Sequence, residues 1–362
     1  MKNKKPKKVI EVSVSTIILV CITLVGLVNS IFLFQTQQTQ ASPAWLSGYT
    51  TRKKVTITEQ TGAGTNYQVY LKVGESLGST GMDFHIENNS TDFPVTKNDS
   101  GDIRFTDSDG VTLLDFWVEN VTGTVPNRTA KIWIEIGDDL GVAVDIYTYY
   151  GKNGVANVSN GDTTFLLFDD FDGSSLDTTK WETHDLGTGD RSFSGGIMTQ
   201  STPVSGDSAK ISPIIDPTGR MAQEMLTKTN GARRSFEAMD FNKDPSNRAP
   251  HLIYAISRWN SNMAIEGAWQ EFLLESGGAN VWRIIHTDNR GATTDAIFYD
   301  SDRSVINSKA WGLDVGIIPN IEPIGARFVS AAASMDVDWY LFRKFVFPEP
   351  AFLTSSLQQK PY

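Results

Sequence analysis

The strongest constraint on the fold is a series of short runs, after residue 40, in which apolar and polar residues alternate. The run KIWIEI at residues 131–136, for example, has isoleucine at every second position. Period-two alternation predicts β-strands that bury one face, and the Gly, Asn, Asp and Ser residues between runs are typical of turns. No segment after residue 40 has a sustained helical period, so we expect an all-β fold.

The N-terminal region is different. In the run Val12–Phe34, the apolar residues are interrupted only by Ser, Thr, Cys, Gly and Asn. As a helix, it is long enough to cross a hydrocarbon core of about 30 Å. Five lysines precede the run and none follows it nearby: Lys2, Lys4, Lys5, Lys7 and Lys8. This asymmetry predicts that the N-terminus lies inside the cell and that the rest of the chain lies outside. We therefore predict a basic cytoplasmic tail at 1–8, a transmembrane helix at 9–34 and a spacer at 35–44.

A cleaved signal peptide is the alternative for this region. The segment QQTQASPA at residues 37–44 offers small residues, and cleavage near residue 41 would release a secreted protein. Signal-peptide cores span about 7–15 residues, so the longer run favours a retained anchor. The helix also loosely resembles the N-terminal helix of archaeal pilin-like proteins. That resemblance implies a structural pilin-like or envelope subunit.

Charge and cysteine usage exclude other classes. The net charge is −10, although the first eight residues are basic. Nucleic-acid binding needs concentrated Lys and Arg, so we expect no nucleic-acid partner. The single cysteine, Cys21, lies inside the apolar run. The predicted extracellular part of the chain therefore forms no disulfide. We expect side-chain packing to stabilise it, with a bound metal as an additional source of stability.

Alternating runs between residues 45 and 160 predict a small antiparallel β-sandwich. The segments WLSGYTTRKKVTI (45–57), DIRFTDSDG (102–110) and IYTYYGK (146–152) resemble a family of extracellular β-domains of unknown function. Such domains occur widely in archaeal and bacterial surface proteins. The resemblance implies a surface location and no particular activity. We expect packing roles for the aromatic residues here: Trp117, Trp133, Tyr149 and Tyr150.

All the Asn-X-Ser/Thr sequons of the chain fall in or beside this domain. With an exterior location they are candidate glycosylation sites. The six asparagines are Asn88, Asn89, Asn98, Asn120, Asn127 and Asn157.

Residues 161–347 predict a larger antiparallel sandwich, followed by a polar tail at 348–362. Its opening motif FDDFDGSSLDTTKW (168–181) and closing motif MDVDWYLFRKF (335–345) resemble the first and last strands of concanavalin A-like domains. That superfamily includes laminin G-like modules, lectins and a class of β-glucanases. The resemblance implies a jelly roll whose terminal strands meet.

The resemblance also implies a structural calcium between Asp170 and Asp338. Asp169, Asp170 and Asp172 crowd into the opening motif, and crowded carboxylates either stay solvated or share a cation. Two acids supply too few of the six to eight oxygens that calcium takes, so solvated carboxylates remain an equal alternative.

A glycosidase is the alternative to a binding function. Glycosidases of this superfamily use two carboxylates on one strand face with an Asp between them. Here the related pair is Glu271 and Glu275, but Leu273 replaces the central Asp. A flat strand separates positions i and i+4 by roughly 13 Å, against the about 5–5.5 Å of retaining enzymes.

The sequence therefore favours a non-catalytic, membrane-anchored extracellular module for glycan binding or adhesion. Aromatic rings pack on the apolar faces of sugars, and polar groups nearby fix the ligand. The candidate ligand-binding residues are Trp259, Trp269, Trp282, Trp311, Arg258 and Arg283.

Overall fold

The computed structural model describes residues 43–360 with internal gaps. The gaps are 88–91, 204–206, 216–218, 231–235, 239–240, 243–250, 256–257, 266–267, 277–279, 290–293, 312–319, 322–323 and 328–332. Within 230–279, 289–294 and 311–333, and at Thr354, the description covers the strand backbone only. Residues Ala44–Tyr362 form one compact unit. The predicted transmembrane helix lies outside the described residues. Among those described, no helix is long and apolar enough to cross a membrane.

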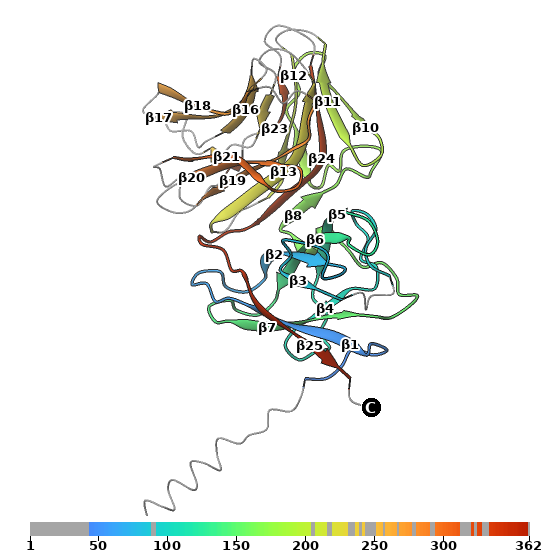
Figure 1. The fold of residues 1–362 in the computed structure, drawn as a ribbon. Helices are drawn as coiled ribbons and strands as arrows, with labels where there is room; N and C mark the ends of the chain where they lie inside the picture. Colours follow the sequence, from blue (N-terminus) through green and yellow to red (C-terminus); the bar gives the residue numbers. More distant parts are fainter. Residues whose placement is uncertain are drawn as a thin grey trace, which may run out of the picture. The chain divides into compact units, whose positions relative to one another are not determined.

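The first sandwich consists of two four-stranded sheets, with strand orders β25-β1-β7-β4 and β3-β2-β6-β5 (Figure 1). Its strands are β1 (Thr51–Ile57), β2 (Tyr67–Gly74), β3 (Phe84–His85), β4 (Arg104–Thr106), β5 (Phe116–Thr122), β6 (Thr129–Ile136), β7 (Val144–Tyr150) and β25 (Phe352–Gln359).

The alternation seen in the sequence sets the register of this sandwich. In the β2–β6 pair, Leu71 lies opposite Ile132 and Val69 opposite Ile134. All four side chains are buried in one apolar core. Because the side-chain period of a strand is two, a slip of one residue would turn this set toward water.

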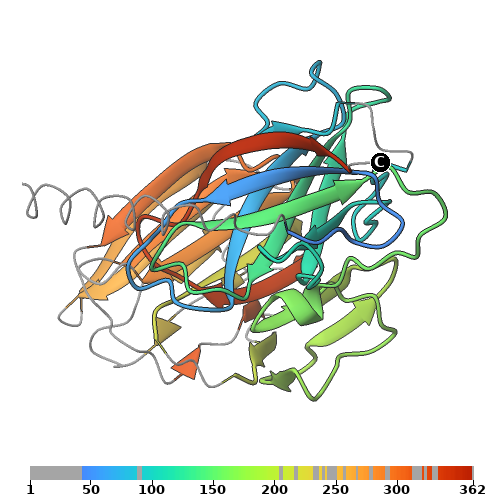
Figure 2. The same cartoon turned by 90° about the horizontal axis from the view of Figure 1, so that it is seen from below.

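The C-terminal segment is not the tail that the sequence predicts. Residues Phe352–Gln359 form β25, which pairs antiparallel with β1, Thr51 lying opposite Gln359 (Figure 2). The buried Arg52 donates from Nε to Oε1 of Gln358 at 2.8 Å. The first sandwich is therefore completed by residues about 300 positions away in the sequence, and the second sandwich is inserted between β7 and β25.

The second sandwich, residues 165–347, is antiparallel and confirms the all-β prediction. One eight-stranded sheet contains β8 (Leu167–Asp169), β10 (Asp190–Phe193), β11 (Met198–Thr202), β13 (Met221–Asn230), β19 (Arg283–Asn289), β20 (Thr294–Asp300), β21 (Val305–Trp311) and β24 (Ala333–Lys344). A seven-stranded sheet contains β9 (Trp181–Thr183), β12 (Ser208–Pro213), β14 (Phe236–Ala238), β16 (His251–Ala255), β17 (Arg258–Ile265), β18 (Ala268–Ser276) and β23 (Ile324–Arg327). Two small elements are β15 (Phe241–Asn242) with β22 (Asn320–Ile321), and the short helix α2 (Gly161–Thr164).

The first and last strands of the second sandwich meet, as the resemblance to concanavalin A-like domains implied. In the β8–β24 pair, Phe168 lies opposite Leu341. Trp181 of the opening motif is buried, and its Nε1 donates to Oδ2 of Asp169 at 2.7 Å. The opening motif therefore fixes the edge where the chain enters the second sandwich.

Aromatic side chains join the two sandwiches directly. Trp117 and Trp133 of the first sandwich share a buried cluster with Phe165, Phe168 and Trp339. The ring centroids of Trp117 and Phe168 are 4.7 Å apart, within the range of favourable edge-to-face contacts. The packing roles predicted for four aromatic residues of the first domain are confirmed, because these residues are at most 2% exposed: Trp117, Trp133, Tyr149 and Tyr150.

Candidate functional site

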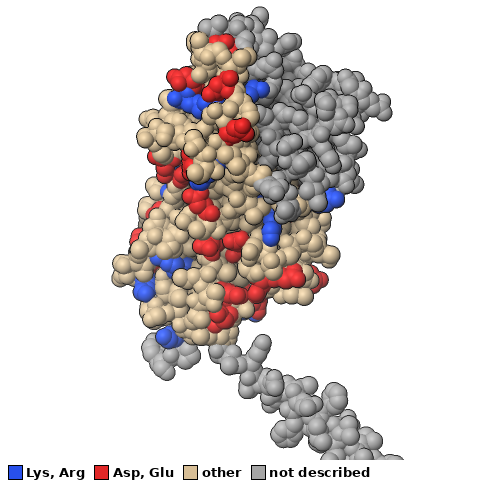
Figure 3. Space-filling model, turned by 180° about the vertical axis from the view of Figure 1, so that it is seen from behind, with Lys and Arg blue, Asp and Glu red and all other residues tan. Residues whose placement is uncertain are grey.

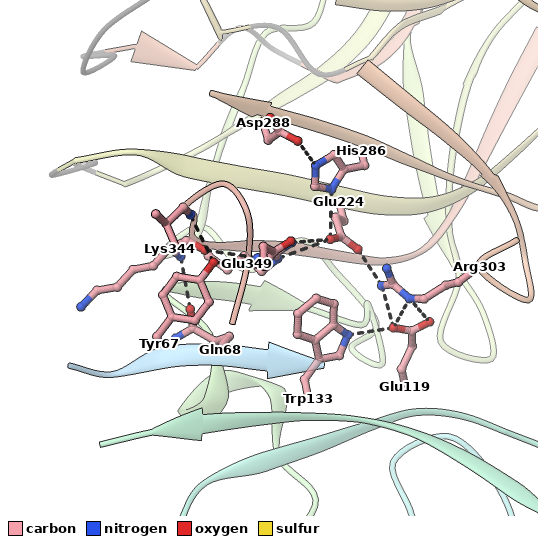
Figure 4. Close-up of polar contacts among 12 residues, drawn as sticks. Tyr67, Gln68, Glu119, Trp133, Glu224, His286, Asp288, Arg303, Lys344 and Glu349 are labelled. Carbon is pink, nitrogen blue, oxygen red and sulfur yellow. Dashed lines mark hydrogen bonds and ion pairs between the residues drawn. The ribbon is translucent and has the colours of Figure 1, made fainter. Parts of the chain in front are cut away.

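Charged side chains from both sandwiches meet in a buried network beside the aromatic cluster (Figure 4). We call this network the ionic junction. Its members are Glu119, Glu224, His286, Asp288, Arg303, Arg343 and Glu349. The first sandwich supplies Glu119 from β5, and the β13, β19 and β24 strands and the β20–β21 turn supply most of the others.

Arg303 is the central cation of the ionic junction. Its Nη2 lies 2.6 Å from Oε2 of Glu119 and 2.6 Å from Oε2 of Glu224. The guanidinium also lies 5.1 Å from the ring centroid of Trp133 and 5.8 Å from that of Trp339. One side chain from the β20–β21 turn thus binds both a carboxylate of the first sandwich and one of the second.

Arg343 provides a second bridge. Its Nη2 lies 3.2 Å from Oε1 of Glu224 and 2.9 Å from Oε1 of Glu349. Glu349 precedes β25, and its Oε2 accepts from the Tyr67 hydroxyl at 3.1 Å. The junction therefore also holds the segment that returns the chain to the first sandwich.

His286 is cationic in this environment. Its Nδ1 lies 3.1 Å from Glu224 and its Nε2 lies 2.7 Å from Asp288. Burial alone would lower the pKa of His286, but the hydrogen bonds to Asp288 and Glu224 outweigh burial and raise it from 6.5 to about 9. Burial alone would raise the pKa of Glu224, but Arg303, His286 and Arg343 hold it well below its usual range.

These contacts make the ionic junction a structural feature rather than an active site. The side chains of Glu224, Asp288 and Arg343 are at most 2% exposed, so a substrate has no access to them. Both ring nitrogens of His286 are bonded to carboxylates, which leaves neither free to act as a general base.

A second meeting point, which we call the acid cluster, contains Asp170, Asp172 and Asp338. Lys97, from the loop before β4 of the first sandwich, forms an ion pair with Oδ1 of Asp338. The neighbouring Asn98 donates from Nδ2 to Oδ2 of Asp170 at 2.6 Å. The structure therefore brings the two predicted calcium ligands to one place, together with a lysine that the sequence did not single out.

The acid cluster does not fit a calcium ion. Calcium takes six to eight oxygen ligands, whereas here an ammonium binds Asp338 and an amide NH₂ group binds Asp170. Among the described residues, no group of three or more His, Cys, Asp and Glu is arranged to hold a metal. Burial and the neighbouring Asp170 raise the pKa of Asp172, which indicates an excess of negative charge.

The six predicted ligand-binding residues are divided between the two sheets of the second sandwich. Trp282 and Arg283 lie at the start of β19, and Trp311 ends β21, all in or beside the eight-stranded sheet. Lys228 Nζ lies 4.8 Å from the centroid of the Trp282 ring. Arg283 is paired with Asp300 at 3.1 Å.

The other three, Arg258, Trp259 and Trp269, lie on the β17–β18 hairpin of the seven-stranded sheet. The same hairpin carries Glu271 and Glu275. All five positions belong to described strands, but their side chains, like that of Trp311, lie outside the described residues. In the register, position 259 is opposite 275, and 264 is opposite 269.

Comparison with protein families gives one match. Residues 99–184 match the model of a family described as a domain of unknown function, DUF2341. The DUF2341 match begins within the first sandwich and ends within the second. It therefore includes Glu119, Trp133 and the whole opening motif, which together line the contact between the sandwiches. No curated protein matches the chain.

Solved structures with some similarity include a protein of unknown function from Shewanella oneidensis MR-1. It is 12% identical over 51% of this chain and 85% of that one, with a TM-score of 0.38. A β-glucanase from Bacillus licheniformis is 11% identical over 49% and 98%, with a TM-score of 0.40. A lichenase from a mouse hindgut metagenome is 11% identical over 49% and 99%, with a TM-score of 0.39. At these scores we assign no activity from them.

The sequons beside the DUF2341 match differ in their surroundings. Asn98 uses its Nδ2, the atom to which a glycan would be attached, to bond Asp170, and its Oδ1 accepts from Trp117. Asn127 and Asn157 are exposed and Asn120 is half-buried, whereas Asn88 and Asn89 lie outside the described residues.

Acidic side chains are spread over the described part of the surface. Figure 3 shows Asp and Glu along one face of the molecule, with Lys and Arg among them.

Proposed function

We propose that this chain is a non-catalytic surface module that binds a glycan on the β16–β18 face of its second sandwich. The observation that carries the proposal is the register of β17 and β18. Directly opposed residues share a face, as do alternate residues along a strand. Positions 260, 262, 269 and 271 therefore share one face, and they are Asn, Asn, Trp and Glu, whereas the pair 259 and 275 lies beyond a shift in the register.

The opposite face of the hairpin has a different composition. Its positions on the same side of the register shift include Met263 and Ile265 of β17 and Phe272 of β18. A sheet with one apolar face and one polar, aromatic face buries the first and presents the second. Tryptophan supplies ring faces for sugar, and carboxylates accept hydrogen bonds from sugar hydroxyls.

A glycan array probed with residues 44–362 tests the proposal. We expect saturable binding to at least one polysaccharide, with a loss of at least tenfold in affinity for Trp269→Ala. Trp282→Ala is the matched control, because it removes the same side chain from the other sheet. Absence of binding by the folded protein, or an equal loss in the control, would reject the proposed face.

A glycoside hydrolase is the second candidate, supported by one observation. Glu271 and Glu275 both lie on β18 with Leu273 between them, and the register of β18 shifts between positions 273 and 275. This interpretation expects release of reducing ends from a polysaccharide, abolished by Glu271→Gln or Glu275→Gln. If those variants instead bind normally and no release is detected, the binding function is retained.

The proposal includes a membrane anchor formed by residues 9–34 with the N-terminus inside. Its support is the apolar run and the lysines before it. Deletion of residues 1–34 should move the protein from the membrane to the soluble fraction. Recovery of the intact chain in the soluble fraction, with a new N-terminus near residue 41, would favour secretion.

A further inference from the structure

The acid cluster contains a positive charge that comes from the other sandwich. Lys97 belongs to the first sandwich, whereas Asp338 belongs to β24 and Asp170 and Asp172 follow β8. The side chains of Lys97 and Asp338 are only 26% and 25% exposed, so water screens their attraction partly. The ion pair therefore links the first sandwich to the last strand of the second.

Gly196 lies directly beside the acid cluster. A Cβ added to Gly196 would lie 2.6 Å from Oδ1 of Asp172, 3.6 Å from the Asp170 carbonyl oxygen and 3.8 Å from Lys97 Nζ. Gly196 also has a φ of +71°, in the left-handed region that glycine adopts readily. One carboxylate oxygen, one carbonyl oxygen and one ammonium thus lie around Gly196 and leave no room for a side chain there.

We propose that the ammonium of Lys97 is the resident cation of the acid cluster, so that the two sandwiches are joined there without a metal. The ammonium satisfies Asp338, and the Asn98 amide satisfies one oxygen of Asp170. A divalent cation would need those same oxygens and would be repelled by the ammonium. Removal of the ammonium leaves three adjacent carboxylates, which is the hard-oxygen environment that calcium favours.

The test compares the full chain with Lys97→Met in calcium and in chelator. Thermal unfolding of the wild type should be the same in both conditions. Lys97→Met should unfold about 2–6 °C lower in chelator and recover most of this loss in millimolar calcium. Lys180→Met is the matched control, since Lys180 is also 26% exposed and pairs with Asp162 away from the cluster.

Terbium luminescence, excited through tryptophan, gives a second measurement that does not depend on stability. Trp117 donates to Asn98 and so lies close to the cluster. We expect terbium emission from Lys97→Met, and we expect the double variant Lys97→Met/Asp338→Asn to lose it. The wild type should give no more emission than the Lys180→Met control. Wild-type stabilisation by calcium, or wild-type emission that Asp338→Asn removes, would overturn the proposal. So would a Lys97→Met variant that matches the wild type in both measurements.

Discussion

Replacement of Arg303 by methionine should destabilise the protein more than any comparable surface change. Arg303 pairs with Glu119 and Glu224, whose side chains are 2% and 1% exposed. Removing one partner of a buried ion pair costs about 3–5 kcal/mol, because it leaves an uncompensated charge. Loss of the contacts with aromatic rings adds about 1 kcal/mol. Glu224 keeps Arg343 and His286, which reduces the cost, so we expect a loss of about 3–4 kcal/mol.

Arg191→Met is the matched control. Both arginine side chains are 10% exposed, but the partner of Arg191, Asp185, is 36% exposed. Pairs that water reaches contribute about 0–1 kcal/mol, so the control should lose little. Urea unfolding of both variants, followed by tryptophan fluorescence, gives the two free energies of unfolding.

A double-mutant cycle isolates the ion pair itself. Glu119→Gln removes the charge that Arg303→Met leaves unpaired, so the double variant should be less destabilised than the sum of the single variants by about 1–3 kcal/mol. A loss for Arg303→Met no larger than that for Arg191→Met, or full additivity of the losses of Arg303→Met and Glu119→Gln, would refute a stabilising role for the buried pair.

Three further outcomes follow from the structure. The pKa of His286 is raised from 6.5 to about 9, so its contribution is complete below about pH 6.5 and is lost as pH rises through 9. Unfolding measured from pH 7 to 10 should therefore show a fall on the order of 2–3 kcal/mol that His286→Gln lacks; equal slopes would contradict this. Deletion of residues 351–362 removes the partner of β1 and should greatly increase hydrogen exchange of the β1 amides, whereas unchanged protection would refute the pairing. In a glycosylating host, peptide mass spectrometry should find glycan on the exposed Asn127 and none on Asn98, whose Nδ2 is bonded inside the fold; occupied Asn98 would contradict this structure.

Most strands of the first sandwich could be predicted because each has an apolar side of its own. β6 begins two residues before the alternating run at 131–136, whereas β3, with only two residues, is too short to show such a pattern. β25 could not be predicted, because FLTSSLQQ has few apolar residues and obtains its order from pairing with β1. The run at residues 251–259 predicts a single strand from its sequence, which is wrong: the structure divides it into β16 and β17, and Trp259 lies on β17, which pairs with β16.

The ionic junction could not be predicted, although each of its strands could. The alternation of side chains along β13 places Glu224 on the face that points away from the interior of the second sandwich. An acidic residue on that side normally faces water. It is buried here because the first sandwich covers the same face, and Glu119 and Arg303 reach it from distant parts of the sequence. Charged residues within apolar strands, as in MDVDWYLFRKF, were the only sign of this contact available in the sequence.

Scanning calorimetry of residues 44–362 tests the central structural claim most directly. If β25, the aromatic cluster and the ionic junction join the sandwiches into one cooperative unit, the protein should show a single transition whose calorimetric and van't Hoff enthalpies agree. Arg303→Met should lower and broaden that transition. Two separate transitions in the wild type, or a van't Hoff enthalpy near half the calorimetric value, would show that the sandwiches unfold independently and would contradict the account.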